Sequence, residues 1–178
     1  MRNKILILCV AILTSTGASA AEQFHIADPI EKNNMTIQPN YFTGVKMESL
    51  NKDMAKTMAM DDKAIHLQVD IHAAKGEPHG FGKGSWIPYL KITYKIEKLG
   101  SDFHKAGQLL PMTAKGGTHY ANNIDMDGPG QYHLTYEFEP PSVNGFIRHI
   151  DKATGVPEWW APFMLDWTFE YPIKTKAN

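Results

Sequence analysis

The sequence predicts an all-β protein that folds as an antiparallel β-sandwich. Apolar and polar residues alternate in several segments, as expected of strands that bury one face. Turn signals rich in glycine and proline separate these segments. The chain has 178 residues with no internal repeat and no linker-like tract, which favours a single domain.

Alternation is clearest in residues 65–72, where the apolar side chains take the odd positions and the polar side chains the even ones. We expect a half-buried strand there. Three further segments alternate in the same way, residues 90–96, 132–138 and 166–171. Residues 40–47 are a weaker strand candidate, and residues 51–60 are expected to form a short helix or a methionine-rich loop.

The N-terminus has the three parts of a secretory signal peptide in order. Arg2 and Lys4 precede an apolar run, and an A-x-A cleavage site ends at Ala20. The run is too short to span a bilayer, and nothing later in the chain is apolar enough to do so. We therefore expect residues 1–20 to be removed, and residues 21–178 to form one exported domain without membrane insertion, most simply in the bacterial periplasm.

Removal of the signal peptide takes away Cys9, the only cysteine, and leaves 16 basic and 19 acidic residues. A chain without cysteine forms no disulfide, no zinc ribbon and no blue-copper thiolate site. The slightly acidic balance also lacks the basic footprint of a nucleic-acid-binding protein. All eight histidines remain, with most of the nine methionines.

Histidine and methionine are therefore the residues left to bind a metal. His66 lies on the polar face of its expected strand, about 20 Å from His72, so these two cannot share one small ion. Met112 and His119 flank a polar loop, residues 113–118, that can turn both side chains toward one point. Imidazole suits several transition metals and thioether sulfur favours copper. Each histidine taken singly is, however, more often a surface or structural residue.

Several ordered motifs are more specific than these spacings. They are IHLQVDIHA from residue 65, HGFG from 79, WIPYL from 86, LPM from 110, GTHY from 117, GPGQYHL from 128, PPS from 140, RHID from 148 and WWAPF from 159. In this order they resemble the periplasmic iron-transport proteins of bacterial pathogens, which include a nineteen-kilodalton periplasmic antigen. A treponemal thirty-four-kilodalton lipoprotein antigen is a more distant relative. The resemblance covers about residues 41–171.

The resemblance implies an immunoglobulin-like (cupredoxin-like) β-sandwich that forms a homodimer. It implies a copper site near the dimer interface and a role in high-affinity iron uptake beside an inner-membrane iron permease, with iron bound weakly or transported. The implied copper ligands are His66, Met112, His119 and His149, the last reaching the metal across the dimer.

One position departs from the family pattern. The family commonly has a glutamate two residues after the strand histidine, where this chain has Gln68. An amide is a weaker, neutral ligand than a carboxylate, so we expect copper binding to be retained and a second metal position at Gln68 to be altered.

Two other functions are alternatives to this one, a metal carrier and an enzyme. A copper or zinc carrier without an iron role is supported by the methionines at 54, 58 and 60. An enzyme, such as a metal reductase, is not predicted, because nothing in the sequence supplies a route for electrons.

Overall fold

The computed structural model describes residues 21–48 and 64–174. The expected signal peptide, the segment 51–60 and the last four residues lie outside the described residues. The described residues form strands joined by turns and one 3-10 turn. The elements are β1 (Glu22–His25), β2 (Ile30–Lys32), β3 (Met35–Thr43), β4 (Ala64–Ala73), β5 (Lys91–Lys98), β6 (His104–Ala114), β7 (Gly117–Asp125), β8 (Gly130–Glu139), η1 (Pro141–Asn144) and β9 (Phe163–Tyr171).

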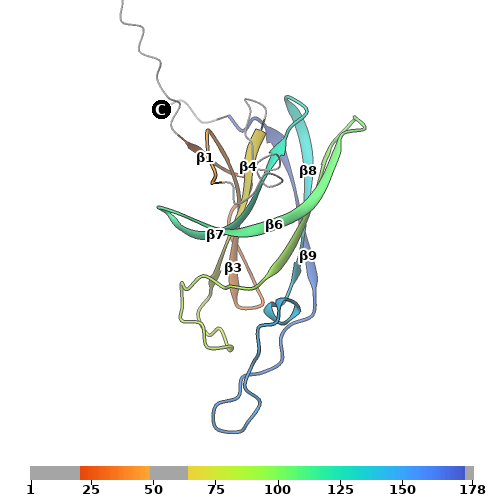
Figure 1. Cartoon of the computed structure of the whole chain (residues 1–178). Helices are drawn as coiled ribbons and strands as arrows, with labels where there is room; N and C mark the ends of the chain where they lie inside the picture. Colours follow the sequence, from red (N-terminus) through yellow and green to blue (C-terminus); the bar gives the residue numbers. More distant parts are fainter. Residues whose placement is uncertain (1–20, 49–63, 175–178) are drawn as a thin grey trace, which may run out of the picture.

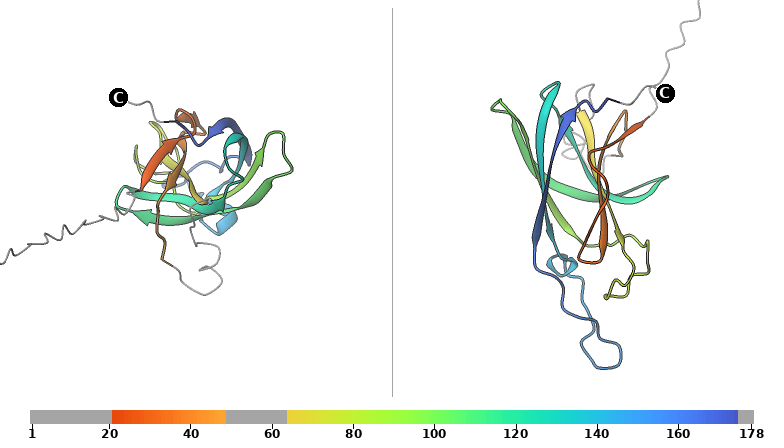
Figure 2. Two further views of the ribbon diagram at one scale, coloured as in Figure 1. Left: turned by 90° about the horizontal axis from the view of Figure 1, so that it is seen from above. Right: turned by 180° about the vertical axis from the view of Figure 1, so that it is seen from behind.

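All strand pairs are antiparallel, in the order β1-β3-β4-β7-β6-β5-β8-β9, and β2 pairs with the free end of β3. The long strand β6 belongs to both layers (Figure 1). Its first half pairs with β5 and its second half, from Leu110, pairs with β7. Seen from above, the strands curl around the core (Figure 2). The predicted all-β antiparallel fold is confirmed, and its two layers are joined by strand β6, which takes part in both.

The four clearest predicted strands correspond to β4, β5, β8 and β9. The apolar positions of β4 and β8 face the space between the layers, where Ile65, Leu67, Tyr132 and Leu134 are fully buried. Aromatic rings join the two layers, because Tyr41 of β3 contacts Phe169 of β9 at a ring-centroid distance of 6.3 Å. These contacts form the core that supports the rest of the sheet.

The weak strand predicted at 40–47 differs from the observed β3, which begins at Met35 and ends at Thr43. Pro39 obscures this strand in the sequence, because proline cannot donate a ladder hydrogen bond. Pro39 lies between the residues of β3 that pair with β2 and those that pair with β1. The central proline is therefore tolerated, and residues 44–48 leave the sheet as an irregular segment.

One other local prediction needs correction. The expected loop at 113–118 is mostly ladder, since Thr113 pairs with Thr118 and only Lys115 and Gly116 lie between the strands. Before β5, Trp86 forms an isolated bridge to His72. Residues 21–48 and 64–174 contain no helix that is long and apolar enough to cross a bilayer.

Candidate metal centre

A groove of about 1160 Å³ lies on the outer face of the layer formed by β1, β3, β4 and β7. The even positions of β4, from His66 to His72, line this groove, whereas its odd positions face the core. The irregular segment 44–48 lines the groove as well. His66 and Gln68 are consequently only 2% and 7% exposed. The sequence predicted a strand buried on one face, but at this point β4 is buried on both faces.

The strand register brings three of the four predicted copper ligands into this groove. His66 is on β4, and Met112 of β6 lies directly opposite His119 of β7, so their side chains share a face. The rings of His66 and His119 meet edge to face, with centroids 5.7 Å apart. Met112 and His119 therefore converge, as predicted, through a cross-strand pair and not through a loop.

Asn123 fixes the orientation of the His66 ring. It lies opposite His66 in the β4–β7 ladder, and its Oδ1 is 2.7 Å from His66 Nδ1. Because a carboxamide oxygen only accepts, Nδ1 carries the proton and donates it. The lone pair of Nε2 is then available to a metal, an arrangement common among metal-binding histidines.

Burial favours the neutral form of His66 and His119, two of the four histidines that line the groove. Desolvation lowers the pKa of His66 below 6.5, and the neighbouring His119 lowers it further, while the Asn123 hydrogen bond opposes this. Desolvation also lowers the pKa of His119, partly offset by the Asp70 carboxylate and by a hydrogen bond to the backbone of Gly117. A metal binds the neutral form of imidazole, which is the form that burial favours for both side chains.

Gln68, the predicted second metal position, lies in a polar chain across the groove floor. Its Nε2 donates to Asp70 Oδ1 at 2.8 Å, and Asn40 Nδ2 donates to Asp70 Oδ2 at 2.7 Å. Asn40 Oδ1 in turn accepts from His25 Nδ1 at 2.6 Å. The amides of Gln68 and Asn40 thus each donate to one oxygen of Asp70. Because Gln68 uses its Nε2 for this bond, its carbonyl oxygen is the atom that it can offer to a metal.

His149, the fourth predicted ligand, lies elsewhere. We call residues 145–162, between η1 and β9, the tongue; it projects beyond the sheet at the lower end of Figure 1. His149 is exposed on the tongue and does not line the groove. One chain therefore brings together His66, Met112 and His119 but not His149.

A short relay nevertheless fixes the His149 ring. Thr154 Oγ1 donates its single proton to Asp151 Oδ2 at 2.6 Å, so it accepts from His149 Nδ1 at 2.8 Å. Asp151 Oδ1 also accepts from the backbone N–H groups of Ala153 and Thr154, which closes the tip of the tongue. As with His66, the Nε2 lone pair of His149 is left free, here facing solvent.

The predicted ligands that lie in the groove are the imidazoles of His66 and His119 and the thioether of Met112, without a thiolate. This set fits copper, because thioether sulfur is a soft ligand and imidazole binds both copper oxidation states. Within the described part of the chain, no three His, Cys, Asp or Glu side chains meet at one point.

Sequence reasoning missed the residues that orient the ligands, namely Asn123, Thr154, Asp151, Asp70 and Asn40. Asn123 and Asn40 matter because they are cross-strand neighbours of His66 and Gln68. Strand pairing is the signal that would reveal them. Thr154 and Asp151 form a D-x-x-T turn, which a search for capping-type turn residues finds.

Comparison with known proteins gives consistent matches over nearly the whole chain. Residues 20–172 match the model of a family described as Fe2+ transport protein. A UPF0423 protein of Brucella abortus is 35% identical over 96% of this chain and 92% of its own. The 34 kDa membrane antigen of Treponema pallidum is 29% identical over 85% of this chain and 74% of its own.

Solved structures match the fold as well. Copper-reconstituted P19 from Campylobacter jejuni superposes with a TM-score of 0.75 and 38% identity, covering 85% of this chain and 97% of P19. A copper-bound glutamate-to-glutamine variant of FetP from uropathogenic Escherichia coli gives 0.74 and 37%, covering 85% and 98%. A copper-bound glutamate-to-glutamine variant of P19 gives 0.76 and 38%, covering 85% and 98%.

Proposed function

Because this chain belongs to the Fe2+ transport protein family, we propose that it is a periplasmic, copper-binding accessory protein of high-affinity iron uptake. It binds iron or delivers iron to an inner-membrane iron permease. Its copper is held by His66, Met112 and His119. The observation that carries this proposal is the pair of buried, neutral imidazoles that face each other beside a thioether in one groove.

The fourth copper ligand is His149 of a second chain in a homodimer. Among the residues that the structure describes, no three His, Cys, Asp or Glu side chains meet at one point, and His149 presents its Nε2 on an exposed tongue. Large apolar side chains on and beside the tongue are also exposed, with Ile147 at 89% and Ile150 at 80%. Burial of these side chains against a partner favours an interface that includes the tongue.

Gln68 is compatible with copper in the groove. The copper-bound glutamate-to-glutamine variants of P19 and FetP hold copper after losing one carboxylate. In this chain Gln68 and Asn40 hold the Asp70 carboxylate in place beside this position. We propose that the copper position at the histidines is retained, and that the position at Gln68 is a weak, neutral one.

Mixed dimers test the shared site directly. A His119→Ala chain is co-expressed with a His149→Ala chain, and the heterodimer is purified with two different affinity tags. If His149 acts across the dimer, one of the two sites keeps all of its ligands, and the heterodimer binds one tight Cu(II). If His149 served its own chain, both sites would be damaged and tight binding would be lost. The two homodimeric variants are the controls.

The iron role needs a cellular measurement. Deletion of the gene is expected to slow growth and radioactive-iron uptake under iron limitation, with rescue by the wild-type chain and not by His119→Ala. Metal analysis of protein purified from the periplasm shows whether copper is the metal bound. Unchanged iron uptake together with increased copper sensitivity would contradict the proposal and favour a copper carrier.

A further inference from the structure

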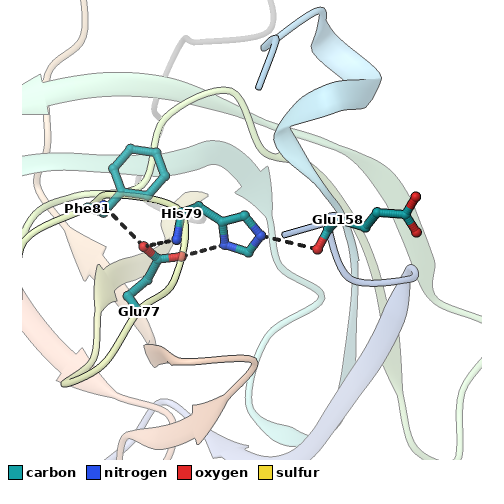
Figure 3. A network of polar contacts seen from close by, with 4 residues as sticks. All are labelled: Glu77, His79, Phe81 and Glu158. Carbon is teal, nitrogen blue, oxygen red and sulfur yellow. Dashed lines mark hydrogen bonds and ion pairs between the residues drawn. The ribbon is translucent and has the colours of Figure 1, made fainter. Parts of the chain in front are cut away.

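Outside the groove, the side chain of another histidine is buried beside a carboxylate (Figure 3). The side chains of Glu77 and His79 are only 3% and 5% exposed. Glu77 Oε1 lies 2.6 Å from His79 Nδ1, and Oε2 accepts from the backbone N–H groups of His79 and Phe81 at 2.9 and 3.1 Å. The carboxylate thus organises the loop that follows β4 and holds the His79 ring in one orientation.

The other side of the ring contacts the tongue. His79 Nε2 lies 3.2 Å from the backbone carbonyl oxygen of Glu158, as Figure 3 shows. A carboxylate and a carbonyl only accept hydrogen bonds, so both ring nitrogens must carry a proton for both bonds to exist. A doubly protonated ring would make both bonds and so join the two loops.

Aromatic side chains pack around the His79 ring. His79 stacks on Trp159 with centroids 4.1 Å apart and planes 11° from parallel, an arrangement suited to a cation over an indole face. Phe146, at the start of the tongue, packs against both Trp159 and Phe81. His79 is thus the polar centre of the contact between the two loops.

The other charged groups at this contact are few. From its own loop His79 faces Glu77, and from the tongue it faces the backbone of Glu158, whose side chain is 89% exposed. That side chain lies 3.6 Å from Arg148, which donates to the carbonyl of Val156 at 3.1 Å. Arg148 thereby ties together the two sides of the tongue next to His149.

We propose that the Glu77–His79 pair is a protonation-dependent anchor that fixes the base of the tongue and thereby positions His149. The charged ring satisfies two acceptors at once, one on each loop. A neutral ring can donate to only one of them, which leaves either the Glu77 carboxylate or the Glu158 carbonyl without its donor. Loss of the proton therefore loosens the tongue. The effect on copper rests on the proposed role of His149, whereas the anchor itself does not.

The protonation state is tested on the full wild-type chain without metal. Nitrogen-15 NMR of the imidazole rings distinguishes an imidazolium from either neutral tautomer. At neutral pH we expect His79 to show two protonated nitrogens, and hydrogen exchange of the tongue amides, relative to those of β8, to accelerate as His79 loses its proton. A neutral His79 beside a fully protected tongue would overturn the anchor.

The variants His79→Phe and His79→Gln separate hydrogen bonding from packing, since phenylalanine keeps the stack on Trp159. Both are expected to raise tongue exchange about tenfold, while the matched change at exposed His104, His104→Gln, leaves it unchanged. Copper affinity should fall in the wild-type background and not in a His149→Ala background. Faster exchange with unchanged copper affinity would uphold the anchor and contradict the proposed role of His149. Unchanged exchange would contradict the anchor.

Discussion

The imidazole rings of His66 and His119 meet at 90°, with their centroids 5.7 Å apart, on two adjacent strands of one sheet. Both rings are almost fully buried, and burial favours their neutral form. Two like charges this close would repel each other strongly in a desolvated site. The pair is thus arranged for a state in which neither ring is protonated, which is the state that a metal requires.

This relationship predicts how the stability of the metal-free protein depends on pH. Below pH 6.5 the unfolded chain protonates both histidines, whereas the folded chain, with its lowered pKa values, does so only at lower pH. Above pH 6.5 both histidines are neutral in the folded and the unfolded chain, so they do not make stability depend on pH. Below pH 6.5 the unfolded chain binds more protons, so the free energy of unfolding falls as the pH drops. Urea unfolding from about pH 8 to about pH 5 measures this. A His66→Gln/His119→Gln variant should lose part of the slope; an equal slope would contradict the prediction.

Asn123 should control the metal affinity of His66. In Asn123→Leu the buried Nδ1–H of His66 has lost its acceptor, which costs about 1–3 kcal/mol of stability. Loss of the ring orientation should weaken Cu(II) binding about 10- to 100-fold. Asn123→Asp keeps an acceptor oxygen and should keep most of the affinity. Asn122→Leu controls for the loss of an amide, because the Asn122 side chain lies on the opposite face and bonds to the backbone of Asn123 and Gln108. Competition titration with a Cu(II) chelator measures all of these, and equal losses in the two leucine variants would refute the orienting role.

The fold could be predicted where apolar and polar residues alternate along a strand. Residues 65–72 and 132–138 alternate because their apolar positions meet the core. Strand β7 escaped prediction because His119, Tyr120 and Ala121 are buried in succession, on both faces. Strand β6 escaped it because the strand changes partner at Leu110, so no single face stays buried along its length.

Part of the grouping of the candidate ligands could also be predicted from the sequence. The resemblance of the ordered motifs assigned His66, Met112, His119 and His149, and the structure places the first three in one groove. Residue spacing alone suggested the Met112–His119 pair for the wrong reason, because a ladder and not a loop joins them. The orienting role of Asn123 depends on strand register, which no local pattern contains.

Thr154 should affect copper only through His149. Thr154→Val keeps the shape of the side chain and removes the oxygen that accepts from His149 Nδ1, so the ring loses its fixed orientation. We expect about tenfold weaker Cu(II) binding, and recovery in Thr154→Ser, which restores the hydroxyl. In a His149→Ala background the valine variant should have no further effect. An equal loss in both backgrounds would place the effect in the fold and not in the ligand.

Gln68→Glu should add a second metal position and weaken the metal-free fold. Gln68 Nε2 donates to Asp70 at 2.8 Å, and a glutamate there would set two carboxylates against each other. The loss of this donor should cost about 1–3 kcal/mol of unfolding free energy at neutral pH, recovered when a cation binds between the carboxylates. Isothermal titration with Cu(II), and with Mn(II) as a surrogate for Fe(II), measures the stoichiometry. Identical stoichiometry and affinity in both proteins would refute a ligand role for position 68.

Tyr120 should contribute to stability without contributing to the metal site, although it follows His119 in the chain. Its hydroxyl donates to the carbonyl of Ile87 at 2.9 Å and accepts from the N–H of Leu90 at 3.0 Å. Burial accordingly raises the pKa of this phenol. Tyr120→Phe leaves both backbone groups without their buried partner, so it should cost about 1–3 kcal/mol in urea unfolding. The side chain faces the core and not the groove, so Cu(II) affinity of the folded variant should equal that of the wild type; a weaker affinity would show that residues 87–90 help to shape the groove.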